Sequence, residues 1–170
     1  DQDGKEVVEY KYDYARSFKE GMAAVTNSGK SGFINHDGTE VVECKYDDVW
    51  DFSEGMAMVR NSGKYGFVNQ DGIEVVECKY DEAWPFSEGL ARISSGGKRG
   101  FIDQNGKEVV ECKYDEAWSF SEGLACIKSG GKWGFIDKNG KEVVECKYDD
   151  AWSFKEGLAL VKSGGKWGFI

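Results

Sequence analysis

Proline, histidine and long apolar runs are scarce in this sequence of 170 residues. Pro85 is the one proline and His36 the one histidine. A single histidine excludes metal sites built from several histidines and argues against a histidine-based catalytic triad. No apolar run approaches the roughly 20 residues that a helix needs to cross a bilayer. We therefore expect neither a membrane-spanning helix nor an enzyme of the triad type.

Basic clusters are missing as well. The chain carries 31 acidic and 22 basic residues, so that its formal net charge is −9. Nucleic-acid binders need a basic stripe that displaces counterions, and none is present. Anionic membrane surfaces are disfavoured for the same reason. We expect neither nucleic acid nor a membrane as a partner.

The cysteines are odd in number and form no CxxC pair, which is a poor disulfide framework. They are Cys44, Cys78, Cys112, Cys126 and Cys146. This usage predicts reduced thiols in a cytoplasmic compartment. Four of them share one position in a repeat, but ligands 34 residues apart would have to converge on one axis to hold zinc. The flanking pattern places them on a buried face, so we expect small buried side chains and no metal site.

Glycine reveals the organisation of the chain. All 23 glycines recur with a period of 34 residues, for example Gly38, Gly72, Gly106 and Gly140. Self-similarity at a fixed period is the signature of a repeat architecture. We expect one repeat domain, 1–170, made of the units 1–34, 35–68, 69–102, 103–136 and 137–170.

The units are predicted to be β-structure. Several glycines per unit would cost a helix about 1 kcal/mol each, and the apolar residues do not recur at helical spacing. In "EVVECKY" (142–148) apolar and polar residues alternate as in a half-buried strand. Asn139-Gly140 predicts a type I′ hairpin turn. Each unit is therefore at least a three-stranded antiparallel meander, and 146–157 either holds a fourth strand or crosses to the next unit.

The repeat pattern "GLALVKSGGKWGFIDKNGKEVVECKYDDAWSFKEG", which joins residues 157–170 to residues 137–157, contains the motifs Lys-Trp-Gly-Phe-Ile-Asp, Asn-Gly, Lys-Tyr-Asp and Phe-x-Glu-Gly. It resembles the bacterial WG-repeat family, also called KWG repeats, over all five units. Ser31, Tyr65 and Arg99 replace the namesake tryptophan in the first three units. The resemblance implies a β-repeat array of the binding or scaffold kind, often a bacterial accessory domain, without established catalytic residues.

Two all-β architectures fit five antiparallel β-meander repeats: a closed five-bladed propeller and an open β-solenoid. Familiar propeller blades run about 40 to 50 residues, which argues against closure. The chain ends argue for it, because "KEVV" (5–8) and "KWGFI" (166–170) are strand partners in every internal unit. An open array would leave both edges bare. We favour the closed propeller.

One position of the repeat varies, and it supplies the candidate ligand-binding residues. It holds Ser31 in the first unit and then Tyr65, Arg99, Trp133 and Trp167. A position that accepts both Arg and Trp is predicted to face solvent, because a tight core rejects such volume changes. The composition is typical of binding hot spots. Drift on a tolerant face is the alternative.

A second aromatic position holds Trp50, Trp84, Trp118 and Trp152, each followed two residues later by Phe. A three-stranded unit cannot bury its own face, so these aromatics are predicted to wedge between neighbouring units. The alternative is an aromatic platform for a sugar or a peptide.

The Asp137-Lys138-Asn139-Gly140 corner resembles the start of a calcium loop. Calcium loops need several oxygen ligands along about 12 residues, and here the acidic residues stop at Asp137. We interpret these corners as hairpin turns.

Taken together, the sequence predicts a non-catalytic, monomeric binding or scaffold module without cofactor, whose target is a protein, a peptide or a glycan. A lectin-like module with exposed aromatics is the alternative. The last two units share 29 of 34 residues, which indicates recent duplication or deliberate design.

Overall fold

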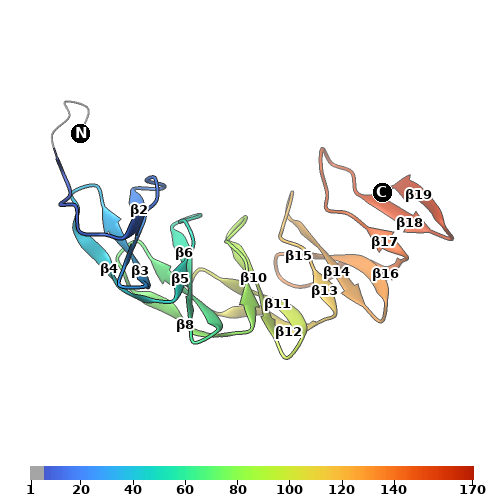
Figure 1. The fold of residues 1–170 in the computed structure, drawn as a ribbon. Coiled ribbons are helices and arrows are strands. Elements are labelled where there is room, and N and C mark those ends of the chain that lie inside the picture. Colours follow the sequence, from blue (N-terminus) through green and yellow to red (C-terminus); the bar gives the residue numbers. More distant parts are fainter. Residues whose placement is uncertain (1–5) are drawn as a thin grey trace. The chain divides into compact units, whose positions relative to one another are not determined.

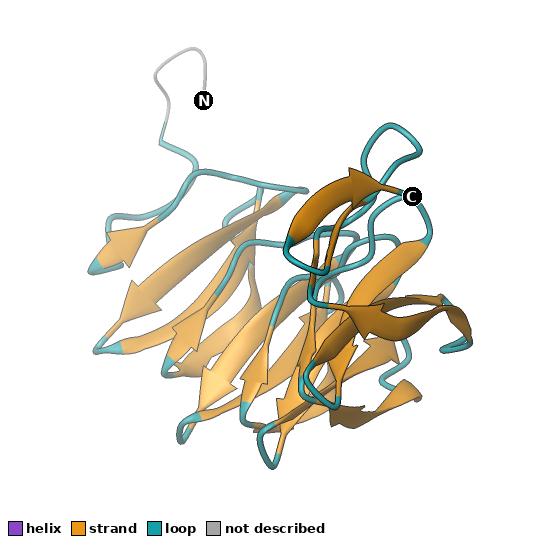
Figure 2. Cartoon of the chain, turned by 90° about the vertical axis from the view of Figure 1, so that its right-hand side faces the viewer, coloured by secondary structure: helices purple, strands orange, loops and turns teal. Residues whose placement is uncertain are grey.

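The computed structural model describes residues 6–170, and every regular element in this range is a β-strand (Figure 2). This range holds no helix that could span a membrane. The strands form five separate antiparallel sheets that follow one another along the chain (Figure 1). The all-β prediction of five meander repeats is confirmed.

The first sheet consists of β1 (Tyr14–Ala15), β2 (Met22–Asn27), β3 (Lys30–Asn35) and β4 (Glu40–Tyr46). The second consists of β5 (Asp48–Val49), β6 (Met56–Asn61), β7 (Lys64–Asn69) and β8 (Glu74–Tyr80). The third consists of β9 (Glu82–Ala83), β10 (Leu90–Ser95), β11 (Lys98–Asp103) and β12 (Glu108–Tyr114). The fourth consists of β13 (Glu116–Ala117), β14 (Leu124–Ser129), β15 (Lys132–Asp137) and β16 (Glu142–Tyr148). The fifth consists of β17 (Asp150–Ala151), β18 (Leu160–Ser163) and β19 (Lys166–Phe169).

The first strand of each sheet settles the question left open by the sequence. The stretch 146–157 contains β17, a two-residue strand that pairs Asp150 with Lys162 and Ala151 with Val161 of β18. It therefore opens the next sheet, and each full sheet has four strands. The 34-residue period is preserved, but each four-stranded sheet spans parts of two sequence units.

The two kinds of hairpin tip differ from each other, and the Asn139-Gly140 corner departs from the expectation. At the tip between β14 and β15 both central residues have positive φ, Gly130 at 57° and Gly131 at 79°, as a type I′ turn requires. At the Asp137–Lys141 corner Gly140 has a φ of 79° and Asn139 is not left-handed. The type I′ prediction for Asn139-Gly140 is therefore wrong, and the corner is a longer loop closed by a left-handed glycine.

Hydrogen bonds explain how the Asp137 corner forms. The Gly140 amide donates to the Asp137 carbonyl at 3.0 Å, and the Asp137 amide donates to the Lys141 carbonyl at 2.9 Å. The Asp137 side chain accepts the amides of Asn139 and Lys141, each at 2.9 Å, and these bonds lower its pKa. The carboxylate is thus used inside the turn, and the interpretation as a hairpin corner is confirmed.

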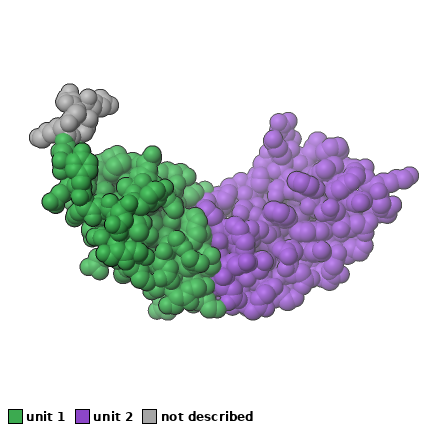
Figure 3. All heavy atoms as spheres, viewed as in Figure 1, with its two compact units in different colours: residues 1–79 green, residues 80–170 purple. Residues whose placement is uncertain are grey.

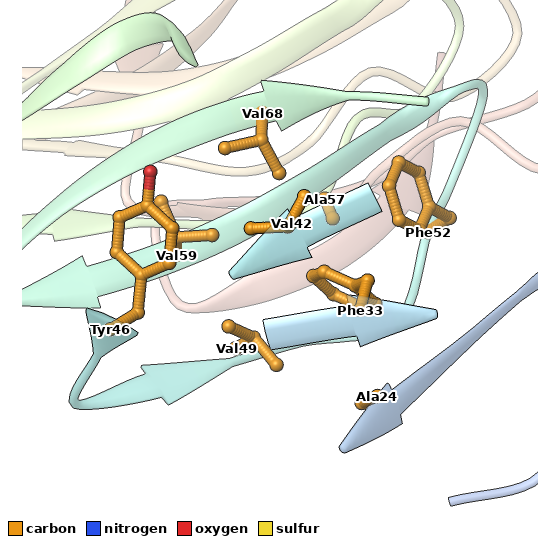
Figure 4. Packing of buried hydrophobic residues seen from close by; sticks show 9 residues of the cluster. All are labelled: Ala24, Phe33, Val42, Tyr46, Val49, Phe52, Ala57, Val59 and Val68. Carbon is orange, nitrogen blue, oxygen red and sulfur yellow. The ribbon is translucent and has the colours of Figure 1, made fainter. Parts of the chain in front are cut away.

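The chain forms two compact units, one of residues up to Lys79 and one of Tyr80–Ile170 (Figure 3). In the first unit, apolar side chains of the first two sheets pack together (Figure 4). The cluster comprises Ala24, Phe33, Val42, Tyr46, Val49, Phe52, Ala57, Val59 and Val68. Fully burying one side chain of this size stabilises the fold by about 1.5 to 3 kcal/mol.

The phenylalanine that follows the second aromatic position lies where one sheet packs on the next. The rings of Phe33 and Phe52 meet edge-on with centroids 4.8 Å apart, and in the second unit Phe135 and Phe154 repeat the arrangement at 5.0 Å. Edge-to-face pairs add about 0.5 to 1.5 kcal/mol to their burial. The predicted wedge between units is confirmed for these phenylalanines.

A carboxylate before a left-handed glycine also ties successive sheets together. Glu122 accepts the amide of Glu156 at 2.7 Å and that of Gly157 at 2.8 Å. Glu20 binds Glu54 and Gly55 in the same way, at 3.0 and 2.9 Å. These hydrogen bonds hold successive repeats together, which is a structural role for the two glutamates.

The two chain ends are not joined by a strand pair in the described residues. β19 pairs with β18, and residues 6–8 of the expected "KEVV" strand lie outside any strand, while Lys5 is outside the described residues. Separate sheets of this kind fit a closed propeller and an open solenoid equally, so closure stays a prediction.

Candidate functional site

The four predicted binding residues occupy the same place on the third strand of four sheets: Tyr65 on β7, Arg99 on β11, Trp133 on β15 and Trp167 on β19. Their exposure differs strongly. Trp167 is 47% exposed, whereas Trp133 is 8% exposed and belongs to a buried cluster. Tyr65 and Arg99 are half-buried. The prediction that this position faces solvent is therefore wrong for Trp133, and each residue lies in a separate sheet.

Neighbouring side chains account for this burial. Arg99 forms ion pairs with Glu82 at 3.0 Å and Glu116 at 3.9 Å, and it donates to Ser94 Oγ at 2.7 Å. Trp133 packs with Phe135, Ala151 and Val161, so it lies against both its own sheet and the next. The position tolerates Arg and Trp because each meets a different set of partners.

The second aromatic position also departs from expectation. Trp118 is 52% exposed and Trp152 is 63% exposed, so neither is the buried wedge that the sequence predicted. Together with Trp133 they line an open cavity of about 380 Å³ in the second unit. We call the site formed by Trp118, Trp133 and Trp152 the tryptophan pocket. Its other lining residues are Ser121, Asp150, Ala151, Ser153, Phe154 and Lys155.

The polar groups of the tryptophan pocket are few. Asp150 forms no ion pair with any described residue, and its Oδ1 accepts the amide of Ala151 at 2.9 Å. Lys155 brings one cation to the rim. The ammonium group of Lys128 lies 5.4 Å from the centre of the Trp133 ring. The site is thus a mainly aromatic surface with one carboxylate.

Cys126 is fully buried and belongs to the same apolar cluster as Trp133 and Ala151 of the pocket lining. Its Sγ weakly contacts the carbonyl oxygen of Ala151 at 3.8 Å. Burial, reinforced by the charge of Asp150, raises the pKa of the thiol to about 12. The thiol is therefore protonated at neutral pH and is a poor nucleophile.

The other four cysteines are half-buried rather than fully buried, which corrects the prediction. Cys44, Cys78 and Cys146 pack against core clusters, and their Sγ atoms lie 3.8 to 4.0 Å from backbone carbonyls of their own sheet. Burial raises the pKa of each thiol. Between residues 6 and 170 no three His, Cys, Asp or Glu side chains are grouped as a metal site would need.

The sequence did not reveal the tryptophan pocket, because it combines two different positions of the repeat. Trp118 and Trp152 belong to one position and Trp133 to the other. Only the stagger of one sheet on the next brings them around one cavity. The sequence pattern predicts each repeat position separately. It therefore cannot show that side chains from two different positions line one pocket.

Comparisons with known proteins give one family. A family model described as WG containing repeat matches residues 1–30, 32–65, 65–98, 100–133 and 133–167. No curated protein matches the sequence.

Solved structures give weaker similarities. Hsv2 of Kluyveromyces lactis is 11% identical, with a TM-score of 0.46, over 86% of this chain and 54% of its own. YCF48 bound to D1 peptide is 12% identical, with a TM-score of 0.40, over 86% of this chain and 59% of its own. The chain spans little more than half the length of either protein.

Proposed function

This chain belongs to the WG-containing repeat family, and from that premise we propose that it is a non-catalytic binding module whose site is the tryptophan pocket. The target is a peptide or a glycan. Each can offer a flat or aliphatic surface to an indole ring, together with polar groups that hydrogen-bond at its edge.

The main support for this proposal is the exposure of Trp118 and Trp152. Two indole rings that are 52% and 63% exposed frame the same cavity as a third, buried tryptophan. Large apolar side chains gathered at a hollow mark binding sites more often than scattered ones do. A volume of about 380 Å³ lies at the small end of ligand pockets, so one peptide side chain or one sugar ring fits it.

The chemistry of the pocket supports binding over catalysis. Asp150 is its one carboxylate, and its remaining polar lining consists of serine hydroxyls and the Lys155 ammonium group. General acid–base catalysis calls for a group with a pKa near the working pH, and nucleophilic catalysis calls for an activated nucleophile. The nearby Cys126 thiol is held in its protonated form by burial.

The alternative is a scaffold without a ligand, because a designed or recently duplicated repeat array need not bind one. Binding tests separate the two. Peptide and glycan libraries are screened by tryptophan fluorescence, and each hit is measured against Trp118→Ala and Trp152→Ala. We expect each substitution to cost about 2 kcal/mol or more of binding free energy, as truncated aromatic hot spots do.

Trp167→Ala is the matched control, because Trp167 is 47% exposed and lies on β19 outside the pocket lining. It should leave affinity unchanged. A ligand whose affinity depends on Trp167 but not on Trp118 or Trp152 would refute the assignment of the site. Absence of any ligand across both libraries would favour the scaffold.

A further inference from the structure

The preceding repeat shows what can occupy a pocket of this kind. Arg92, one repeat before Cys126, extends between Trp84 and Trp118, which lie one repeat before Trp118 and Trp152. Its guanidinium carbon is 3.6 Å from the centre of the Trp84 ring and 5.9 Å from that of Trp118. Its Nη1 donates to the carbonyl oxygen of Ala117. In that repeat a guanidinium therefore fills the space that the tryptophan pocket leaves open.

The first unit contains a second example. Arg16 Nη1 donates to the carbonyl oxygen of Val49 at 3.2 Å and lies 3.7 Å from Asp51. Val49, Ala117 and Ala151 are equivalent positions of the repeat. A guanidinium from two different places in the sequence thus reaches the same carbonyl. In the tryptophan pocket the equivalent carbonyl, of Ala151, accepts a weak hydrogen bond from the Cys126 thiol at 3.8 Å.

The charged residues around Arg92 also differ from those around the tryptophan pocket. In the preceding repeat Arg99 pairs with Glu82 and Glu116, whereas Arg92 forms no ion pair with any described residue. One repeat later Cys126 replaces Arg92 and Trp133 replaces Arg99, while Asp150 keeps the carboxylate of Glu116. The pocket has therefore lost two guanidinium groups and retained an aromatic wall, a carbonyl and an acid. A cation between aromatic faces gains from their negative surfaces.

Resting on the proposed function, we propose that the tryptophan pocket binds the guanidinium group of an arginine side chain from a peptide. The ring of Trp118 takes the face of the guanidinium, Trp152 closes the other side, and the Ala151 carbonyl accepts one N–H. Asp150 supplies the opposite charge. Arginine is favoured over lysine because its planar group stacks on aromatic rings while donating at its edge.

Direct binding tests the charge. Nα-acetyl-arginine amide is titrated against 15N-labelled protein, and the indole N–H signals of Trp118 and Trp152 are followed by NMR. Nα-acetyl-citrulline amide is the neutral control of the same shape. We expect saturable shifts with the arginine probe and at least about tenfold weaker binding of citrulline, the factor that a desolvated cation–π contact supplies. Equal affinity for both probes would overturn the inference.

Reciprocal exchange tests the geometry. Cys126→Arg should fill the pocket from within and abolish binding of the arginine probe, whereas Cys126→Ser keeps the pocket open and should bind normally. The Arg99 guanidinium also lies 5.4 Å from the centre of the Trp84 ring, so Arg92→Cys is combined with Arg99→Trp. This double variant should open a second pocket, so that the Trp84 indole signal also responds. This second variant keeps the proposal testable if an arginine at the fully buried position 126 prevents folding. An unchanged Trp84 signal would contradict the model.

Lys155 provides a further check, because its equivalent beside Arg92 is Ser121. Lys155→Ser removes the one cation of the pocket lining and should tighten binding of the arginine probe. The failures are distinguishable. If glycans or neutral peptides shift the Trp118 and Trp152 signals and the arginine probe does not, the pocket binds but the cation inference fails. If no probe shifts them, the proposed function fails as well.

Discussion

The octapeptide "SGGKWGFI" occurs twice, at 129–136 and at 163–170, and the two copies lie in opposite environments. In the fourth sheet Trp133 is 8% exposed and Phe135 is fully buried. In the fifth sheet Trp167 is 47% exposed and Phe169 is 69% exposed. Identical local sequence thus gives the same strand and turn but not the same burial.

The difference comes from what covers each strand. β15 pairs with β14 on one edge and β16 on the other, whereas β19 pairs with β18 alone among the described residues. A Cβ added to Gly134 would lie 2.5 Å from the carbonyl oxygen of Val144, and one added to Gly168 would meet nothing within 4 Å. A side chain is therefore sterically excluded at Gly134 in the fourth sheet, whereas there is room for one at Gly168 in the fifth. Burial in a repeat protein is therefore a property of neighbouring repeats.

The largest expected effect is on the tryptophans of the two copies. Trp133→Ala should lower the free energy of unfolding by about 3 to 5 kcal/mol, because it leaves a large hole in a buried cluster. Trp167→Ala should lower it by less than about 1 kcal/mol, since nearly half of the side chain already faces solvent. Urea denaturation followed by circular dichroism measures both.

Equal and large losses for the two variants would mean that Trp167 is covered in solution. That outcome would break the comparison and favour a closed ring or an association that buries β19. Equal and small losses would instead mean that the cluster around Trp133 is loosely packed.

A smaller difference is expected at the glycines. Gly134→Ala forces the backbone of β16 away from β15 and should cost about 1 to 3 kcal/mol of stability. Gly168→Ala should stay within about 0.5 kcal/mol of the unmodified chain. Thermal unfolding of the two variants under the same conditions is sufficient. A costly Gly168→Ala would indicate a strand paired along the outer edge of β19.

The comparison also explains how far the sequence alone could lead. The 34-residue period, the antiparallel strands and the Asp137 corner were predictable, because alternation and turn chemistry act within a few residues. The burial of Trp133 was not predictable. Its repeat position holds Ser, Tyr, Arg or Trp, which indicated exposure to solvent, but in the structure each of these residues contacts different partners. The type I′ turn was assigned to Asn139-Gly140, although Gly130-Gly131 adopts it. The tryptophan pocket depends on the stagger of two sheets, which no single repeat encodes.

The smallest expected difference is electrostatic. Lys132 Nζ lies 2.6 Å from Asp149 Oδ1, whereas Lys166, its equivalent on β19, forms no ion pair with any described residue. Lys132→Ala should therefore lower the melting temperature slightly at pH 7, and Lys166→Ala should leave it unchanged. Both residues carry similar exposed charges on identical octapeptides, so they form a matched pair.

Acid separates this ion pair from a loss of packing by the Lys132 side chain. The hydrogen bond from Lys132 holds the pKa of Asp149 below its ordinary value in the folded chain. A carboxyl group whose pKa is depressed by folding stabilises the fold above its unfolded pKa, about 3.9, and that contribution disappears as the pH falls through the folded value. The melting-temperature difference between the unmodified chain and Lys132→Ala should thus be present at pH 5 to 7 and vanish toward pH 2, and it should shrink in 1 M salt, where the Debye length is about 3 Å. A difference that persists at low pH would show that the aliphatic part of Lys132 packs on the sheet, and the contrast with Lys166 would then be one of contact rather than charge.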